Sequence, residues 1–124
     1  MRAAYWQYIR KIPALIYGGI IIYLSHQTRV PSVFYSMSDK FWHFLEYFAF
    51  AVLIYFGWGF VKENRYKALL FMVAFAASDE IHQYFVAGRS CSFLDFLTDA
   101  LGIVAVFILL KIQTNSTGYW YNFF

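Results

Sequence analysis

Charged residues are scarce in this sequence. Asp, Glu, Lys and Arg together make up 14% of the 124 residues, whereas 61% are apolar and 24% are aromatic. Soluble domains carry roughly 25% charged residues, so the composition indicates a membrane protein. Cys91 is the only cysteine, which excludes an intramolecular disulfide and any zinc site built from several cysteines.

Linkers, internal repeats and charged tails are also absent from residues 1–124. We therefore expect a single domain over this range. The ten Lys and Arg residues outnumber the seven Asp and Glu residues, but they are spread along the chain instead of lying on one helix. This pattern gives no indication of nucleic-acid binding.

Four apolar stretches have the length of a membrane crossing. They run over residues 13–29, 39–61, 65–86 and 92–111. A helix of ~20 residues crosses ~30 Å of hydrocarbon, and open strands cannot do so without unpaired backbone groups. The sequence therefore predicts an all-α membrane protein with four transmembrane helices in a bundle. Ser38 is expected to cap the second helix, and Ser92 with Asp95 resembles a capping box at the start of the fourth.

The basic residues predict how these helices are oriented. Seven fall on one side of the predicted membrane, namely Arg2, Arg10, Lys11, Lys62, Arg65, Lys67 and Lys111. Three fall on the other side, namely Arg29, Lys40 and Arg89. Because loops rich in Lys and Arg stay in the cytoplasm, we expect both termini to be cytoplasmic.

The polar residues of the predicted helices share one depth, in their outer half. They are Asp39, Lys40, His43 and Glu46 in the second helix, Asp79, Glu80 and Gln83 in the third, and Asp95 and Asp99 in the fourth. At ~100° per residue, Asp39, His43 and Glu46 lie within ~60° of one another. Asp95, Asp99 and Gly102 do the same on the fourth helix, where Gly102 would let a neighbouring helix approach.

Such faces predict a shared pocket that opens to the outside, because charged residues within a membrane face the interior of a bundle. Lys40 and Arg89 are expected to cover it from the periplasmic side. Six acidic residues then face two basic residues and one or two histidines. Bound protons, a cation or a cationic part of a ligand must balance this excess of negative charge.

These residues also carry a resemblance to a known family. SDKFWHFLEYF followed by SDEIHQYFVAGRSCSFLDFLTDALG resembles the paired signatures of the VanZ-like family of small bacterial membrane proteins, and LSHQTRVP fits its first block. The similarity runs from about Ser25 to Gly102. It implies a multi-pass protein of the bacterial cytoplasmic membrane, in a family associated with resistance to the glycopeptide teicoplanin.

The resemblance also points to particular residues. They are Asp39, Lys40, His43, Asp79, Glu80, Gln83, Arg89, Asp95 and Asp99. Two positions depart from the family pattern: Asp99 stands where Asn is common, and Ala87 where proline is common.

We expect the pocket to bind or shield an amphiphile of the cell envelope. Apart from the lipid bilayer itself, such a ligand would be an envelope lipid, a lipid-linked precursor or a lipophilic glycopeptide antibiotic. Aromatic residues of YFAF and FLDFL would line the apolar part of the pocket. Of the functions considered, binding requires the fewest components that the sequence does not show. This hypothesis leaves the oligomeric state open.

An intramembrane enzyme is the alternative. His43, Glu46, Glu80, Asp95 and Asp99 offer the imidazole and carboxylate ligands that suit Zn, Mn or Fe. Two carboxylates could also act as acid and base on a lipid-linked substrate, with a phosphate held by Lys40 and Arg89. The sequence contains no HExxH motif, nucleophile motif or Gly-rich phosphate loop, so catalysis stays undecided.

Transport is a third possibility. Carboxylates within the membrane are used by proton-coupled carriers. A single chain of four helices leaves little room for alternating access unless it forms an oligomer. We therefore place transport below binding and catalysis.

Overall fold

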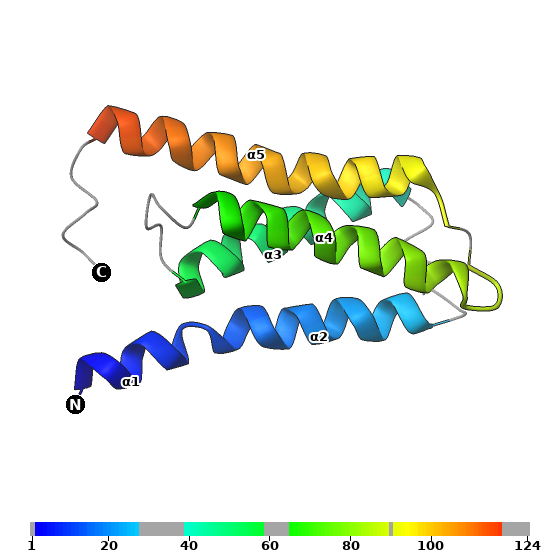
Figure 1. Ribbon diagram of the computed structural model, residues 1–124, viewed down its shortest axis with the longest axis horizontal. Helices are drawn as coiled ribbons and strands as arrows, with labels where there is room; N and C mark the ends of the chain where they lie inside the picture. The colour runs from blue at the N-terminus through cyan, green and yellow to red at the C-terminus, as the bar shows by residue number, and fades with distance from the viewer. Residues whose placement is uncertain (1, 28–38, 59–64, 90, 118–124) are drawn as a thin grey trace.

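Every regular element in the described part of the chain is a helix. The computed structural model describes residues 2–27, 39–58, 65–89 and 91–117. The helices are α1 (Arg2–Ile9), α2 (Ile12–His26), α3 (Asp39–Trp58), α4 (Arg65–Tyr84) and α5 (Phe93–Thr117) (Figure 1). The prediction of an all-α chain is confirmed for these residues.

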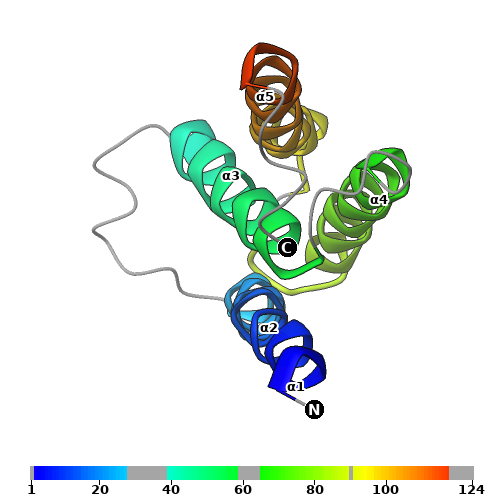
Figure 2. The same ribbon diagram turned by 90° about the vertical axis from the view of Figure 1, so that its left-hand side faces the viewer.

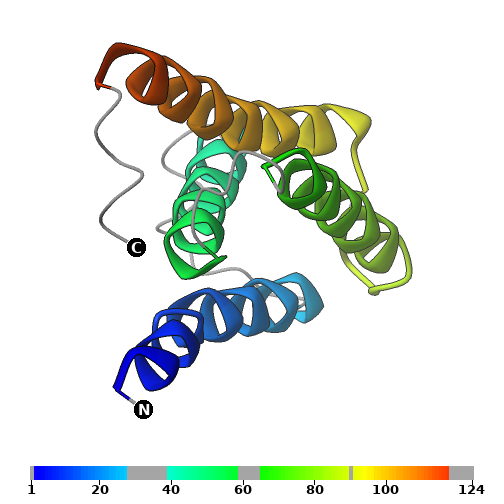
Figure 3. The same ribbon diagram turned by 60° about the vertical axis from the view of Figure 1, so that its left-hand side comes forward.

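The helices alternate in direction along a common long axis. α2 and α4 run toward one end of the molecule, whereas α3 and α5 run back (Figure 1). α3 is the common partner, because it contacts each of the other four helices, and its contact with α5 is the most extensive. Figures 2 and 3 show α2, α4 and α5 arranged around α3.

Several helix boundaries differ from those expected. The residues before Pro13 form an additional short helix, α1, which ends at Ile9 because Pro13 has no N–H to bond to the carbonyl of that residue. α4 ends at Tyr84, two residues early, and the chain turns through Gly88 at φ 83°. α5 continues to Thr117 instead of residue 111, since no Gly or Pro interrupts residues 103–117. α2 ends at His26, three residues before the expected end at 29, where the backbone becomes extended at Gln27. The expected helix end at 61 and the Ser38 cap lie outside the described residues.

Within the described residues, two of the four predicted spans have the length and apolarity of a membrane helix. They are α3 over Asp39–Trp58 and α5 over Phe93–Gln113. α2 has 15 residues, and α4 carries a polar end. Large apolar side chains nonetheless face outward on all four helices, among them Ile22, Phe56, Leu70 and Leu101. An outer surface of this kind is unusual for a soluble monomer and typical of a protein surrounded by lipid.

α3 and α5 cross closely where Gly102 faces Phe44 and Phe48. A Cβ atom on Gly102 would lie 2.5 Å from the carbonyl oxygen of Phe44 and 2.9 Å from the backbone nitrogen of Phe48. Only glycine allows the two backbones to approach this closely. The crossing places the preceding turn of α5, which carries Asp99, against the first turns of α3.

Candidate functional site

Buried polar side chains gather at the end of the bundle where α2 and α4 end and α3 and α5 begin. We call this set the polar layer. It consists of Ser25 on α2, His43 on α3, Asp79, Glu80 and Gln83 on α4, and Asp95 and Asp99 on α5. A buried carboxylate costs free energy unless it is paired or hydrogen-bonded, so the partners of each acid define what the layer can do.

His43 and Asp99 form the innermost contact of the layer. The Nδ1 atom of His43 lies 2.9 Å from Oδ1 of Asp99, and the Asp99 side chain is fully buried. The second oxygen of Asp99, Oδ2, is buried and has no hydrogen-bond partner within the described residues. This contact therefore satisfies only half of the Asp99 carboxylate.

Asp79 belongs to a closed network of neutral donors. The Ser25 hydroxyl donates to Oδ1 of Asp79, and Nε2 of Gln83 lies 3.2 Å from both Oδ2 of Asp79 and the Ser25 hydroxyl. The network joins the end of α2 to the end of α4. Ser25 was missed as a site residue, although it is the first polar residue after the apolar run of α2.

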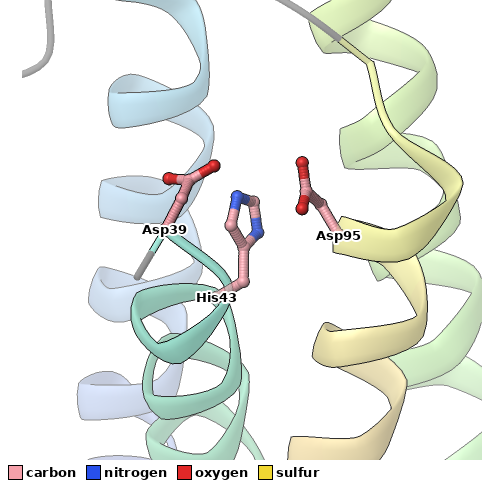
Figure 4. A group of neighbouring side chains, drawn as sticks. All are labelled: Asp39, His43 and Asp95. Carbon is pink, nitrogen blue, oxygen red and sulfur yellow. The ribbon is translucent and has the colours of Figure 1, made fainter. Parts of the chain in front are cut away.

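The outer edge of the layer is an ion pair beside exposed charge. Nζ of Lys40 lies 2.8 Å from Oδ1 of Asp95, and the two side chains are 46% and 7% exposed. Asp39 is exposed. Figure 4 shows the Asp39 and Asp95 carboxylates on either side of the His43 ring, so this edge joins the buried layer to the surface.

Glu80 links α4 to the start of α5. Its Oε2 atom accepts a hydrogen bond of 3.1 Å from the backbone N–H of Ser92, whereas Oε1 is buried without a partner in the described part of the chain. The expected capping box is therefore wrong. The Ser92 N–H donates to Glu80, which lies on another helix, whereas the Asp95 carboxylate accepts a hydrogen bond from Lys40.

Other predicted residues lie at the margins of the layer. Glu46 is half-buried, one turn beyond His43, and Arg89 is close enough to act on it electrostatically. His82 is exposed, as expected from its angle on the helix, but it is not isolated. Its Nε2 atom lies 3.3 Å from Nδ1 of His26, and the two rings stack. No sequence pattern indicates this pair, because the contact depends on how α2 and α4 pack.

A family model described as VanZ/LLP1 matches residues 3–114. The chain belongs to the VanZ/LLP1 family. The resemblance stated from the sequence is thereby confirmed, and the match includes all the residues of the polar layer. No curated protein and no solved structure matches the chain.

Among the described residues of this VanZ/LLP1 protein, two groups of side chains have the spacing needed to hold a metal ion. One consists of Asp39, His43 and Asp95, and the other of His43, Glu80 and Asp99. In each group one ligand atom per residue lies within 4.8 Å of the others. The five metal ligands suggested by the sequence thus do not form one set, because Glu46 belongs to neither group and Asp95 is grouped with Asp39.

Proposed function

We propose that this protein crosses the bacterial cytoplasmic membrane four times, through α2, α3, α4 and α5, with both termini in the cytoplasm. The alternating helix directions support this topology. The start of α1 and the end of α5 lie at the same end of the molecule (Figure 1). Arg10, Lys11, Arg65, Lys67 and Lys111 belong to that end as well, as the positive-inside rule requires of a cytoplasmic face. The polar layer then faces the periplasm.

We propose that the polar layer binds the headgroup of an envelope amphiphile at this outer end. The proposal rests on the ion pair formed by Lys40 and Asp95, in which the Lys40 side chain is exposed and the Asp95 side chain is buried. Exposed apolar side chains lie next to it in sequence, including Phe41, Phe93 and Leu94. A charged edge flanked by lipid-facing apolar surface fits a ligand that has a polar head and a hydrocarbon chain.

The charges at this edge define what a headgroup would have to offer. Carboxylates of Asp39 and Asp95 accept hydrogen bonds from hydroxyl or ammonium groups, and Lys40 pairs with a phosphate or a carboxylate. These contacts are strengthened where the surrounding lipid and protein exclude water. Envelope lipids, lipid-linked precursors and lipophilic glycopeptides all combine such a headgroup with an apolar part. Binding or shielding one of them requires no chemical step.

The proposal is tested by ligand binding to protein purified in mild detergent. Native mass spectrometry identifies lipids that remain bound, and titrations with a lipid-linked precursor and with teicoplanin are performed separately. Loss of a charge-assisted hydrogen bond in Asp95→Asn should weaken binding about 10-fold or more. Lys67→Gln, at the opposite end, should leave it unchanged. Equal affinities in the two variants, or no saturable binding of any amphiphile by the wild type, would refute the proposal.

An enzyme acting on the same class of ligand is a second candidate, favoured by the contact between His43 and Asp99. A carboxylate that orients an imidazole is a common arrangement of general bases. If the protein is such an enzyme, the His43→Gln variant should still bind the lipid-linked substrate but should no longer turn it over. A wild-type protein that binds the amphiphile without consuming it would leave only the binding function.

A further inference from the structure

The innermost part of the polar layer has a feature that headgroup binding does not require. His43, Glu80 and Asp99 come from α3, α4 and α5, and their ligand atoms all lie within 4.8 Å of one another. We propose that these three residues hold a divalent first-row transition-metal ion, of the Zn²⁺ or Mn²⁺ type. The proposed metal site lies deeper than the edge formed by Lys40 and Asp95. It does not depend on whether the polar layer binds a headgroup.

Two unpartnered oxygens support a bound cation. Glu80 and Asp99 are 4% and 0% exposed, and Oε1 of the first and Oδ2 of the second have no hydrogen-bond partner within the described residues. Leaving such an atom buried and unpaired costs about 1–3 kcal/mol, and more when it is charged. A metal ion bound between them would satisfy both atoms at once.

The remaining oxygen of each carboxylate is already fixed. Glu80 uses Oε2 to accept from the backbone N–H of Ser92, and Asp99 uses Oδ1 in its contact with His43. Ligating carboxylates and imidazoles are commonly oriented by such outer contacts, which hold the ligand atoms in place before the metal arrives. The three side chains are thus held on rigid helices and by their own hydrogen bonds.

Asp79 and Glu80 both lack a cationic partner within the described residues, but only Asp79 has side-chain donors on both of its oxygens. Asp95 is paired with Lys40, and Asp79 accepts from Ser25 and Gln83. Glu80 accepts from the backbone N–H of Ser92 and interacts with the Cys91 thiol, but it has no cationic partner within the described residues. A divalent ion would balance the charge of Glu80 and Asp99 together.

The ligand types select the class of metal. One imidazole nitrogen with carboxylate oxygens suits Zn²⁺, Mn²⁺ or Fe²⁺, whereas Mg²⁺ and Ca²⁺ prefer oxygen ligands alone. The neighbouring group of Asp39, His43 and Asp95 is a weaker choice. Asp39 is exposed, and Asp95 would first have to give up its contact with Lys40.

The test is a Zn²⁺ titration of protein that has been purified in mild detergent, stripped with a chelator and analysed for bound metal. All samples carry His82→Gln, because His26 and His82 lie 3.3 Å apart and could bind zinc themselves. We expect one Zn²⁺ per chain and a rise in unfolding temperature on binding. Glu80→Gln and Asp99→Asn should each weaken binding about 100-fold or more. Glu46→Gln and Asp95→Asn should retain it.

Folding of the variants is checked by circular dichroism and by unfolding in the absence of metal. A second measurement needs no variant of the proposed ligands: pulsed electron paramagnetic resonance of the Mn²⁺-loaded protein should detect one coordinated imidazole nitrogen. Absence of saturable Zn²⁺ binding, or absence of that nitrogen coupling, would overturn the proposal. Equal affinity in Glu80→Gln and Glu46→Gln would do so as well, whereas loss of headgroup binding alone would leave the metal site intact.

Discussion

His43 and Asp99 lie 56 residues apart in the sequence, yet their Nδ1 and Oδ1 atoms are 2.9 Å apart in a buried contact. The contact exists because α3 and α5 cross closely at Gly102, one turn after Asp99. Packing of two apolar helices therefore positions the charged groups of the polar layer. Substitutions that weaken this crossing should therefore also alter the chemistry of the polar layer.

Gly102→Ala tests the crossing itself. The added methyl group would lie 2.5 Å from the carbonyl oxygen of Phe44, a backbone atom that cannot move away by a rotamer change. We expect a loss of about 1–3 kcal/mol in the free energy of unfolding, measured by reversible denaturation in detergent. Gly19→Ala is the control, because nothing lies within 4 Å of its Cβ position. The same loss in both variants would show that the crossing has no special role.

The coupling between His43 and Asp99 can be measured with a double-mutant cycle. We expect His43→Gln and Asp99→Asn to be non-additive by about 0.5–3 kcal/mol, because each removes the partner of the other. Unfolding of metal-free protein in detergent gives the four free energies. Additive effects would mean that the two side chains do not stabilise one another.

Removing Lys40 and removing Asp95 should lower the stability of the protein by different amounts. Lys40→Gln leaves the Asp95 carboxylate, 7% exposed, without its cation, whereas Asp95→Asn leaves a half-exposed ammonium group that water can solvate. We therefore expect Lys40→Gln to lower the unfolding temperature more than Asp95→Asn. The reverse order would contradict the burial that the structure assigns to Asp95.

The reactivity of Cys91 should depend on Glu80. Partial removal of the Cys91 thiol from water raises its pKa, and the hydrogen bond with Glu80 and the charges of Glu80 and Asp95 raise it further. Because the thiolate is the reactive form, Glu80→Gln should lower the pKa and speed maleimide labelling of purified protein near neutral pH. The labelling rates of the wild type and the Glu80→Gln variant should converge at a pH well above the pKa of the Cys91 thiol in either protein. Unchanged labelling at every pH would show that the carboxylate does not act on the thiol.

The sequence was sufficient to predict those features that depend on composition and periodicity. Apolar runs indicated helices, and the angles around them correctly placed Asp79, Glu80 and Gln83 inward and His82 outward on α4. Gly102 was expected to allow close approach of another helix, and it does so against α3. The family followed from the motifs and is confirmed by the match over residues 3–114.

Partners across helices could not be predicted in the same way. Ser92 was assigned to Asp95 because the two are close in sequence, but packing places Glu80 beside its N–H. Ser25 and the stacked pair of His26 and His82 were missed because their roles depend on how α2 and α4 meet. The participation of the polar layer in binding or catalysis stays a prediction until variants are measured.

Labelling of Cys91 shows directly whether the polar layer opens to the outside of the cell, as the proposed topology requires. Cys91 is exposed beside the layer and is the only cysteine of the chain, so a membrane-impermeant maleimide applied to intact cells should label it. In a Cys91→Ser background, Gln7→Cys on α1, at the opposite end, should be labelled only after the membrane is permeabilised. Labelling of Gln7→Cys in intact cells, with Cys91 protected until permeabilisation, would place the polar layer in the cytoplasm and contradict the account.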